Sequence, residues 1–396
     1  MEETRVRLSH EQSSSKKMIK PLNPHLSEDI CLAIFLRCPL EDIFKFKCIS
    51  KVWNSNLSSP SFIYNWMQYN YSDDLPWNLL YKYESECCVA HLYSHSRLIS
   101  NHSFRFLNPD KETVTPLCSS NGLVLCAKRI KIKWHYYVCN PLTQKSFLLP
   151  IPPIPHLKSA TCFTCEISSV STTYKVLRIP LPDKKRCDSY KYQIQVYAPG
   201  FEKWKVYHIP AAQGVKWGLT NYDSPVVMQG EMFYWMEKRE TIIAFSETGV
   251  SELNLPGFAY NVSNLVRCLG ESEGMILYAR IRRRIERETL ELSVWELREE
   301  NFLLLHKNIP LCGLFARMNS KLDGILLNNG WGDRIQVSFS PADRNVILIG
   351  CENYVWMYNI NTKVYSELRQ PCSATDNYSR SCPPLALKAM PTIVPT

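Results

Sequence analysis

HYYVCNPLTQKSFLLP, residues 135–150, contains an apolar run, a turn at Asn140-Pro141, a second short run and a closing proline. Two extended runs on either side of turn-forming residues predict a β-hairpin. The same order of strand, tight turn, strand and proline occurs four more times, as QIQVYAPGFEKWKVYHIP (193–210), TIIAFSETGVSELNLP (241–256), LSVWELREENFLLLHKNIP (292–310) and YVWMYNINTKVYSELRQP (354–371). The five closing prolines lie 60, 46, 54 and 61 residues apart, at Pro150, Pro210, Pro256, Pro310 and Pro371. This spacing indicates a repeated structural unit.

Each hairpin is preceded by another apolar strand, as in GLVLCA, TYKVLRIP, EMFYWME, GMILYARI and NVILIGCE, and in most units by a further strand. About four strands in roughly 55 residues is typical of kelch-type propeller blades. One such sheet cannot bury both faces alone, so neighbouring sheets must stack in a ring. We expect six blades over residues 86–371, with five or seven as alternatives. Residues 86–107 could add strands to a blade that the C-terminal end closes, and residues 311–334 could form an extra or degenerate blade.

A different pattern occurs near the N-terminus, where DICLAIFLR (residues 29–37) is almost entirely apolar. Ser27 predicts an N-cap with acidic residues in the first turn, and Pro39 predicts a helix end near Arg37. Three i,i+4 pairs give apolar stripes that cover most of the circumference: Ile30/Ile34, Cys31/Phe35 and Leu32/Leu36. A helix that is apolar on all sides must be buried on all sides.

PLEDIFKFKCISKVW (39–53) and SSPSFIYNWM (58–67) predict two further helices, so residues 25–70 form a three-helix unit. Three short helices can bury one side of the first helix only. Each large apolar side chain left in water forgoes about 1.5–3 kcal/mol. The exposed stripe therefore predicts a protein-binding surface, and the alternative is that the helix packs beneath the rest of the chain.

This segment, from Leu26 to Phe62, resembles the F-box motif. The matching positions are Leu26, Asp29, Ile30, Ile34, Leu36, Arg37, Pro39, Leu40, Phe46, Cys48, Lys51, Trp53, Pro60 and Phe62. The resemblance implies docking onto a Skp-type adaptor and, through it, onto a cullin-based ubiquitin ligase. The positions that it assigns to adaptor binding are Leu26, Ile30, Ile34, Pro39, Leu40 and Trp53, part of which must hold the three helices together.

Two departures from the motif bear on the strength of docking. Ser27 stands where the family has proline, and Glu41-Asp42 occupies a place that is often basic. We therefore expect weaker or more selective adaptor binding.

The repeat region also resembles a family, the plant F-box proteins with a kelch-like F-box-associated domain. Its signature is present as CSSNGLVLC (118–126) followed by VCNPLTQKSFLLPIPP (138–153). Together the two resemblances imply an α+β multidomain protein, a small three-helix F-box followed by an all-β propeller of four-stranded kelch-like repeats.

The remaining segments complete the predicted organisation. Residues 1–24 are basic and expected to be disordered, residues 71–85 to be a linker, and the Pro-rich residues 372–396 to be a flexible tail. No secretory signal or membrane span is predicted, because the first twenty residues have no apolar core and no run approaches the ~18 apolar residues of a span. Many of the sixteen cysteines lie in apolar strands, as Cys126 and Cys139 do, which is typical of small buried hydrophobes in a reducing compartment. We expect a cytoplasmic or nuclear protein, or one found in both.

Sites for chemistry are sparse in the sequence. Cys162-x-x-Cys165 has zinc-like spacing, but no second pair follows it at zinc-finger spacing, and residues three apart on a strand point to opposite faces. His91 and His95 lie in a strand-like context without the glutamate of a zinc protease. Scattered turn aspartates favour local backbone bonding over a glycosidase or sialidase-like site: Asp183, Asp188, Asp223, Asp323, Asp333 and Asp343. We expect no catalytic residue, metal or cofactor.

Contacts to a further partner are predicted from charge and exposed aromatic residues. The net charge of +9 weakly favours an acidic partner. The arginine run of ARIRRRIERE (279–288) is interpreted as a solvated hairpin, with a basic rim for an acidic target or a nuclear-import or RNA-binding patch as alternatives. Trp217 and Trp331, beside glycines, and Arg283 are the candidate target contacts. Trp204, Trp235, Trp295 and Trp356 are predicted to lie in the blade cores.

These features together predict the substrate-recognition subunit of a Skp–cullin–F-box ubiquitin ligase. Its F-box would bind the adaptor and its propeller loops would bind a target protein, with no membrane or nucleic-acid partner. The alternatives are a non-degradative scaffold that binds the adaptor, and a propeller enzyme acting on a glycan or small molecule.

Overall fold

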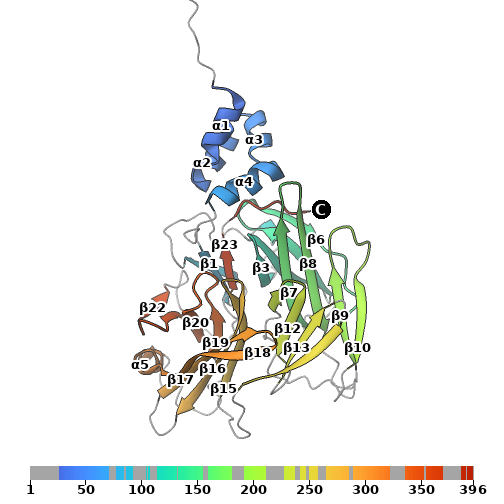
Figure 1. Cartoon of the computed structure of the whole chain (residues 1–396). Helices are drawn as coiled ribbons and strands as arrows, with labels where there is room; N and C mark the ends of the chain where they lie inside the picture. Colours follow the sequence, from blue (N-terminus) through green and yellow to red (C-terminus); the bar gives the residue numbers. More distant parts are fainter. Residues whose placement is uncertain are drawn as a thin grey trace, which may run out of the picture.

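A helical part stands on one end of a ring of β-sheets in the computed structural model (Figure 1). The structure describes residues 26–70, 77–83, 86–91, 104, 106–107, 114–131, 133–154, 159–180, 191–210, 227–236, 241–246, 249–256, 265–284, 289–321, 335–351, 354–368, 385–388 and 390–395. The predicted basic segment 1–24 lies outside these residues. None of the described helices is long and apolar enough to cross a bilayer.

The helical part consists of α1 (Glu28–Phe35), α2 (Leu40–Lys47), α3 (Lys51–Asn56) and α4 (Pro60–Asn70). The prediction of three helices was wrong at the second, which is two helices. The break occurs after Lys47 because Ser50 begins a new helix, with its Oγ accepting a hydrogen bond from the backbone N–H of Trp53 at 3.1 Å.

The core of this part lies between α2 and α4. Its buried residues are Leu40, Ile43, Leu57, Phe62, Ile63, Trp66 and Met67. Trp66 also fixes the chain between α1 and α2, because its Nε1 donates to the backbone oxygen of Cys38 at 3.0 Å.

Five four-stranded antiparallel sheets are formed by the described residues, each with its strands in chain order from one edge to the other. The first is β3 (Val114–Ser120), β4 (Leu123–Ile130), β5 (Lys133–Asn140) and β6 (Lys145–Leu148). The second is β7 (Ser159–Ile167), β8 (Thr172–Pro180), β9 (Lys191–Tyr197) and β10 (Lys205–Pro210). The third is β11 (Val227–Gln229), β12 (Met232–Met236), β13 (Thr241–Ser246) and β14 (Gly249–Asn254).

The fourth blade is β15 (Leu265–Ser272), β16 (Met275–Arg284), β17 (Thr289–Arg298) and β18 (Asn301–Pro310). The fifth is β19 (Ile335–Phe339), β20 (Val346–Cys351), β21 (Tyr354–Asn359) and β22 (Tyr365–Leu368). The five predicted hairpins are confirmed as the last two strands of each blade.

A sixth sheet has three strands within the described residues, so the prediction of six four-stranded blades is corrected to five blades and this sheet. In it β1 (Trp77–Tyr83) pairs with β2 (Glu86–His91) on one side and with β23 (Leu385–Lys388) on the other. Residues 77–83 were predicted to be linker, but they are a strand of the ring. The expectation that the C-terminal end completes a sheet near residue 86 is met by β23.

Successive sheets bury their faces against each other, as the repeat predicted. Separate apolar clusters lie between the sixth sheet and the first blade and between each following pair up to the fifth blade. Trp204, Trp235, Trp295 and Trp356 are all buried in these clusters, which confirms their predicted core role. Gly270 permits one close approach, since a Cβ built there would lie 2.6 Å from the ring of Phe339 in the next blade.

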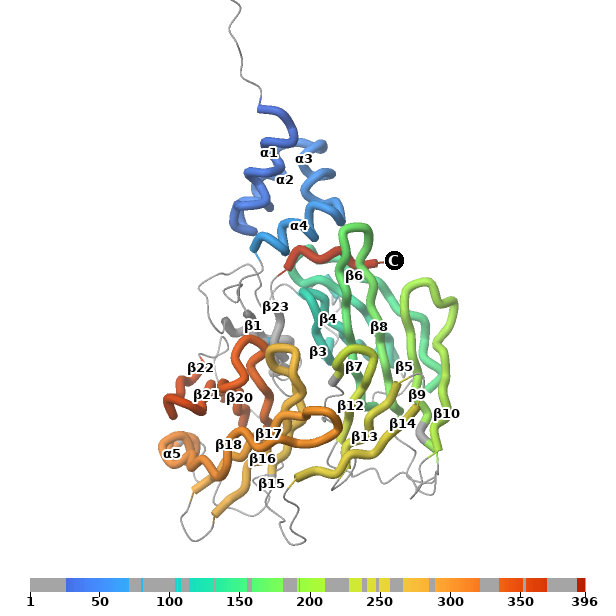
Figure 2. The backbone as a smooth tube through the Cα atoms, viewed as in Figure 1, coloured from blue at the N-terminus to red at the C-terminus, as the bar shows by residue number. Residues whose placement is uncertain are grey.

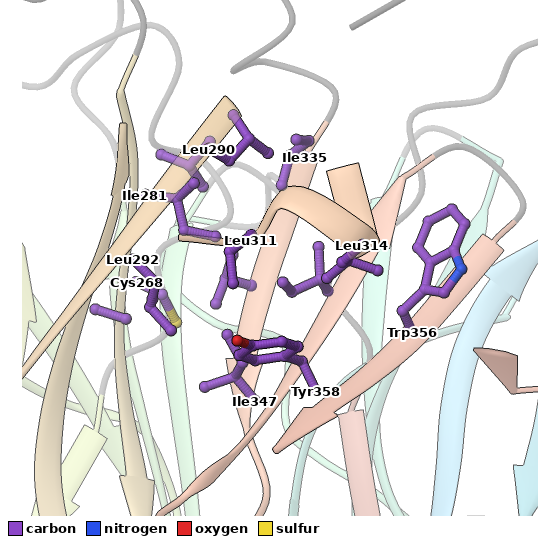
Figure 3. Packing of buried hydrophobic residues seen from close by; sticks show 14 of the residues in the cluster. Cys268, Ile281, Leu290, Leu292, Leu311, Leu314, Ile335, Ile347, Trp356 and Tyr358 are labelled. Carbon is purple, nitrogen blue, oxygen red and sulfur yellow. The ribbon is translucent and has the colours of Figure 1, made fainter. Parts of the chain in front are cut away.

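Residues 311–334 are not a degenerate blade where the structure describes them. They contain α5 (Cys312–Lys321), and residues 322–334 lie outside the described part. Leu311 and Leu314 insert between the fourth and fifth blades, against Leu292 and Ile347 (Figure 3). An amphipathic helix therefore fills the widening space between two diverging sheets.

The predicted flexible tail is corrected for its last part. After β23, residues 390–395 run beneath α4 (Figure 2), and Met390 and Thr392 are fully buried. Met390 belongs to the core of the helical part. The physical reason is that this short segment is apolar enough to enter a space between the helices and the first two blades.

Candidate functional site

The first helix is built as its sequence predicts. Ser27 is in extended conformation and its Oγ accepts a hydrogen bond from the backbone N–H of Ile30 at 3.4 Å. Glu28 and Asp29 place negative charge at the N-terminal end of the helix, where the macrodipole favours it. No residue of α1 is buried, although most of its side chains are apolar.

One side of α1 is used for internal packing. Phe35 contacts the ring of Phe46 with centroids 4.6 Å apart and the ring of Trp53, edge to face, at 5.1 Å. Leu32 and Leu36 pack on the same core. This side joins α1 to α2 and α3.

The other side of α1 is an exposed apolar surface. Further apolar side chains are exposed on the turn after α2 and on α3, which a hydrogen bond from Asn56 Nδ2 to Glu28 Oε1 ties to α1. We define the docking face as the large apolar side chains exposed here: Leu26 (59%), Ile30 (49%), Ile34 (48%), Ile49 (66%) and Val52 (60%). Leu26, Ile30 and Ile34 follow each other at intervals of four residues and so share one side of α1, and exposed apolar side chains that lie together are typical of a protein-binding surface.

The structure separates the six predicted adaptor-binding residues into two groups. Leu26, Ile30 and Ile34 lie on the docking face, and Pro39 is exposed at the start of α2. Leu40 is only 6% exposed and Trp53 packs on Phe35, so both hold the helices together.

Two residues of the docking face were missed from the sequence. Ile49 and Val52 both lie in the stretch 39–53 that was predicted as one helix, and neither was assigned to docking. The missed signal is Ser50, whose capping ends that helix and turns Ile49 outward.

Two lysines of α2 make local contacts. Lys45 pairs with Asp42, Nζ to Oδ1, at 2.7 Å on the solvent side of α2. Lys47 lies over the ring of Phe44 at 5.3 Å, and desolvation by burial lowers the pKa of its ammonium group. Lys47 therefore packs its stem on apolar surface.

Comparison with known proteins identifies this architecture. Residues 77–383 match the family described as F-box protein At3g26010-like, β-propeller. The chain belongs to this F-box protein family. An F-box/kelch-repeat protein of Arabidopsis thaliana, At4g22430, is 23% identical over 88% of this chain and 82% of its own length. The F-box protein At5g49610 of the same plant is 32% identical over 31% of this chain and 32% of its own. Among solved structures, TolB from Acinetobacter baumannii covers 83% of this chain and 70% of its own at 10% identity and a TM-score of 0.47.

The propeller of this F-box protein carries the predicted arginine run on β16. The predicted solvated hairpin is confirmed in its strand pairing, since Arg284 pairs with Thr289 on β17. It is not confirmed as solvated, because four of its arginines are half-buried on β16: Arg280, Arg282, Arg283 and Arg284. Residues 285–288, with Arg287, lie outside the described part of the chain. Arg282 and Arg284 contact Glu291 Oε2 at 2.7 and 3.1 Å. Burial alone would raise the pKa of Glu291, but the bonds from the two arginines outweigh it and hold that pKa below its usual value.

The predicted target contacts are only partly placed by the structure. Arg283 lies half-buried between the two paired arginines on β16. Trp217 and Trp331 lie outside the described residues.

The sites considered for metal or catalytic chemistry are structural where they are described. Cys162 and Cys165 are buried on opposite faces of β7, in two different clusters between blades, as predicted. Asp343 accepts hydrogen bonds from the backbone and side chain of Asn345, which is turn bonding. Within the described ranges, no group of three or more His, Cys, Asp or Glu is placed to hold a metal ion.

Proposed function

We propose that this F-box protein is the substrate-recognition subunit of a Skp–cullin–F-box ubiquitin ligase. The observation that carries the proposal is the docking face, because its five side chains are about half exposed or more in the free chain. Each would gain roughly half of the 1.5–3 kcal/mol that full burial of an aliphatic side chain provides. A Skp-type adaptor is the partner that the family relationship supports.

The propeller would hold a target protein while the adaptor and cullin carry the conjugating enzyme. Catalysis would then be by proximity, since bringing a target lysine near the enzyme raises its effective concentration. This role requires no catalytic residue in the chain and fits a protein of the cytoplasm or nucleus. We place Arg283 among the target contacts, where the arginine row on β16 would favour an acidic surface.

The test is co-expression with a Skp-type adaptor, followed by size-exclusion chromatography and reconstitution with cullin, RING subunit and conjugating enzyme. Co-elution and ubiquitin transfer to a co-purified target support the proposal. Failure to bind any of the Skp-type adaptors tested removes its main support. Adaptor binding with no protein stabilised in a knockout would instead favour a non-degradative scaffold.

A further inference from the structure

The C-terminal strut, residues 390–395, connects the helical part to the propeller. Met390 is fully buried in the F-box core, and Ile393 packs against the same cluster. Leu142 from the first blade and Ile167 from the second also contact this cluster. The F-box and two blades therefore share one apolar core that includes residues of the strut. The strut itself runs between α4 and the blades (Figure 2).

Asn140, from the Cys-Asn-Pro turn of the sequence signature, binds the strut. Its side chain is fully buried, and Nδ2 donates to the backbone oxygens of Met390 at 3.0 Å and Thr392 at 2.8 Å. Its Oδ1 accepts from the backbone N–H groups of Leu142 at 2.9 Å and Thr143 at 3.3 Å. One amide thus caps a local turn with its oxygen and holds a segment 250 residues away with its nitrogen.

The Asn-Gly turn of the same signature forms the other contact. Thr392 Oγ1 donates to the backbone oxygen of Asn121. Gly122 has φ +81°, and a Cβ built on it would lie 2.6 Å from Cβ of Met390. Glycine is therefore required both for the turn and for the close approach of the strut.

We propose that Asn121, Gly122 and Asn140 are positioning residues, which lock the strut and thereby fix the F-box on the propeller. Two parts of a chain move relative to each other unless the interface between them is large and apolar. Met390 lies in the apolar cluster that joins the F-box to the first two blades, so it extends the interface between them. Under the proposed function, this fixed orientation sets which lysines of a bound protein face the conjugating enzyme. Only that last step rests on the proposed function.

The first test is hydrogen exchange of the full chain carrying Asn140→Asp. This change keeps the turn acceptor but replaces the donating amide with a carboxylate beside two carbonyl oxygens. Its matched control is Asn359→Asp, because Asn359 Oδ1 accepts from the backbone N–H groups of Asn361 and Thr362 at 3.0 Å in the corresponding turn of the fifth blade. We expect exchange in residues 390–395 and α4 to become at least tenfold faster with Asn140→Asp and to stay unchanged with Asn359→Asp.

Unchanged protection of residues 390–395 and α4 in Asn140→Asp overturns the proposal. If that variant does not fold, Thr392→Val takes its place, because it removes only the hydroxyl donor to Asn121. Faster exchange confined to residues 390–395 and α4 then supports the strut, and wild-type exchange there refutes it.

The second test uses the complex reconstituted with adaptor, cullin, RING subunit and conjugating enzyme, and maps ubiquitin on the lysines of the propeller itself by mass spectrometry. A fixed F-box predicts a restricted set of lysines in wild type and a broader set in Asn140→Asp, with adaptor affinity changed less than twofold. The same set in both proteins overturns the positioning role. If neither wild type nor the variants bind the adaptor, the ligase function and the positioning role both fail. Hydrogen exchange still shows whether Asn140 holds the strut in place.

Discussion

Exchanging Ile34 for aspartate separates docking from folding on α1. Ile34 is 48% exposed in the free chain, so Ile34→Asp forgoes burial of the other half and adds a negative charge in the last turn of α1; the free energy of unfolding should fall by about 1–2 kcal/mol. At the interface, the change forgoes burial of the remaining half of the side chain, about 0.7–1.5 kcal/mol. Burying the new carboxylate without a partner adds at least about 2 kcal/mol. The adaptor should therefore bind at least about 100-fold more weakly, at 1.4 kcal/mol for each factor of ten.

Leu40→Ala should lower stability strongly and adaptor binding only indirectly, the reverse of Ile34→Asp, although the motif assigns both residues to docking. Leu40 is 6% exposed in the F-box core, and removal of such a side chain typically costs 2–5 kcal/mol of stability, so about 3 kcal/mol is expected here. The F-box should melt at a lower temperature, and adaptor binding should weaken only through the unfolded fraction.

Isothermal titration with the adaptor and thermal unfolding of the free protein measure the two effects. Val364→Asp, at a 63% exposed position between β21 and β22, is the control for an added surface carboxylate and should leave both unchanged. A folded Ile34→Asp protein with wild-type affinity would refute the docking face. A Leu40→Ala protein with wild-type stability but lost binding would refute the division of the motif into two groups.

Three further outcomes test the propeller. Gly270→Ala should lower the free energy of unfolding by about 1–3 kcal/mol, because the added Cβ overpacks the contact with Phe339 of the fifth blade. Gly249→Ala, where the added Cβ meets open space, should leave it unchanged, and urea unfolding of the two variants measures the difference. The pKa of Glu291 is lowered from 4.5, so the stability from its arginine pairs is present above pH 4.5 and lost as the pH falls through the lowered pKa. The difference in melting temperature between wild type and Glu291→Gln should therefore be constant from pH 7 to 5 and shrink as the pH falls below 4.5. Burial raises the pKa of the Cys165 thiol to about 12, so iodoacetamide at pH 8 should modify the exposed Cys48 and leave Cys165 unmodified. Peptide mass mapping measures the labelling, and equal labelling of the two cysteines would contradict the buried position of Cys165.

The blades were predictable because their pattern is local. Alternating apolar residues, turn residues and a closing proline define each hairpin within about 18 residues. Closure of the ring was not predictable in the same way. Leu79 on β1 pairs with Ala386 on β23, some 300 residues later. That pairing depends on which strand edge is still unpaired after the other sheets have formed, which a local pattern does not contain.

The docking face was predicted in part for a similar reason. The apolar circumference of α1 indicates an unsatisfied surface, and Ile30 and Ile34, which the motif assigns to docking, are both exposed. Periodicity alone does not say which stripe packs inward. The rings of Phe46 and Trp53 decide that by packing on Phe35, and their position depends on the helix break at Ser50.

The signature residues bind both their own turn and a segment that is distant in the sequence. Asn140 would be a good turn residue in any blade, because its Oδ1 caps the following backbone N–H groups. An aspartate could do that as well, so the turn alone does not require the amide. The two carbonyl oxygens of the strut do require it, since only Nδ2 can donate to both. The choice of asparagine over aspartate at this turn is thus explained by a segment at the far end of the chain, and by the F-box core that this segment enters.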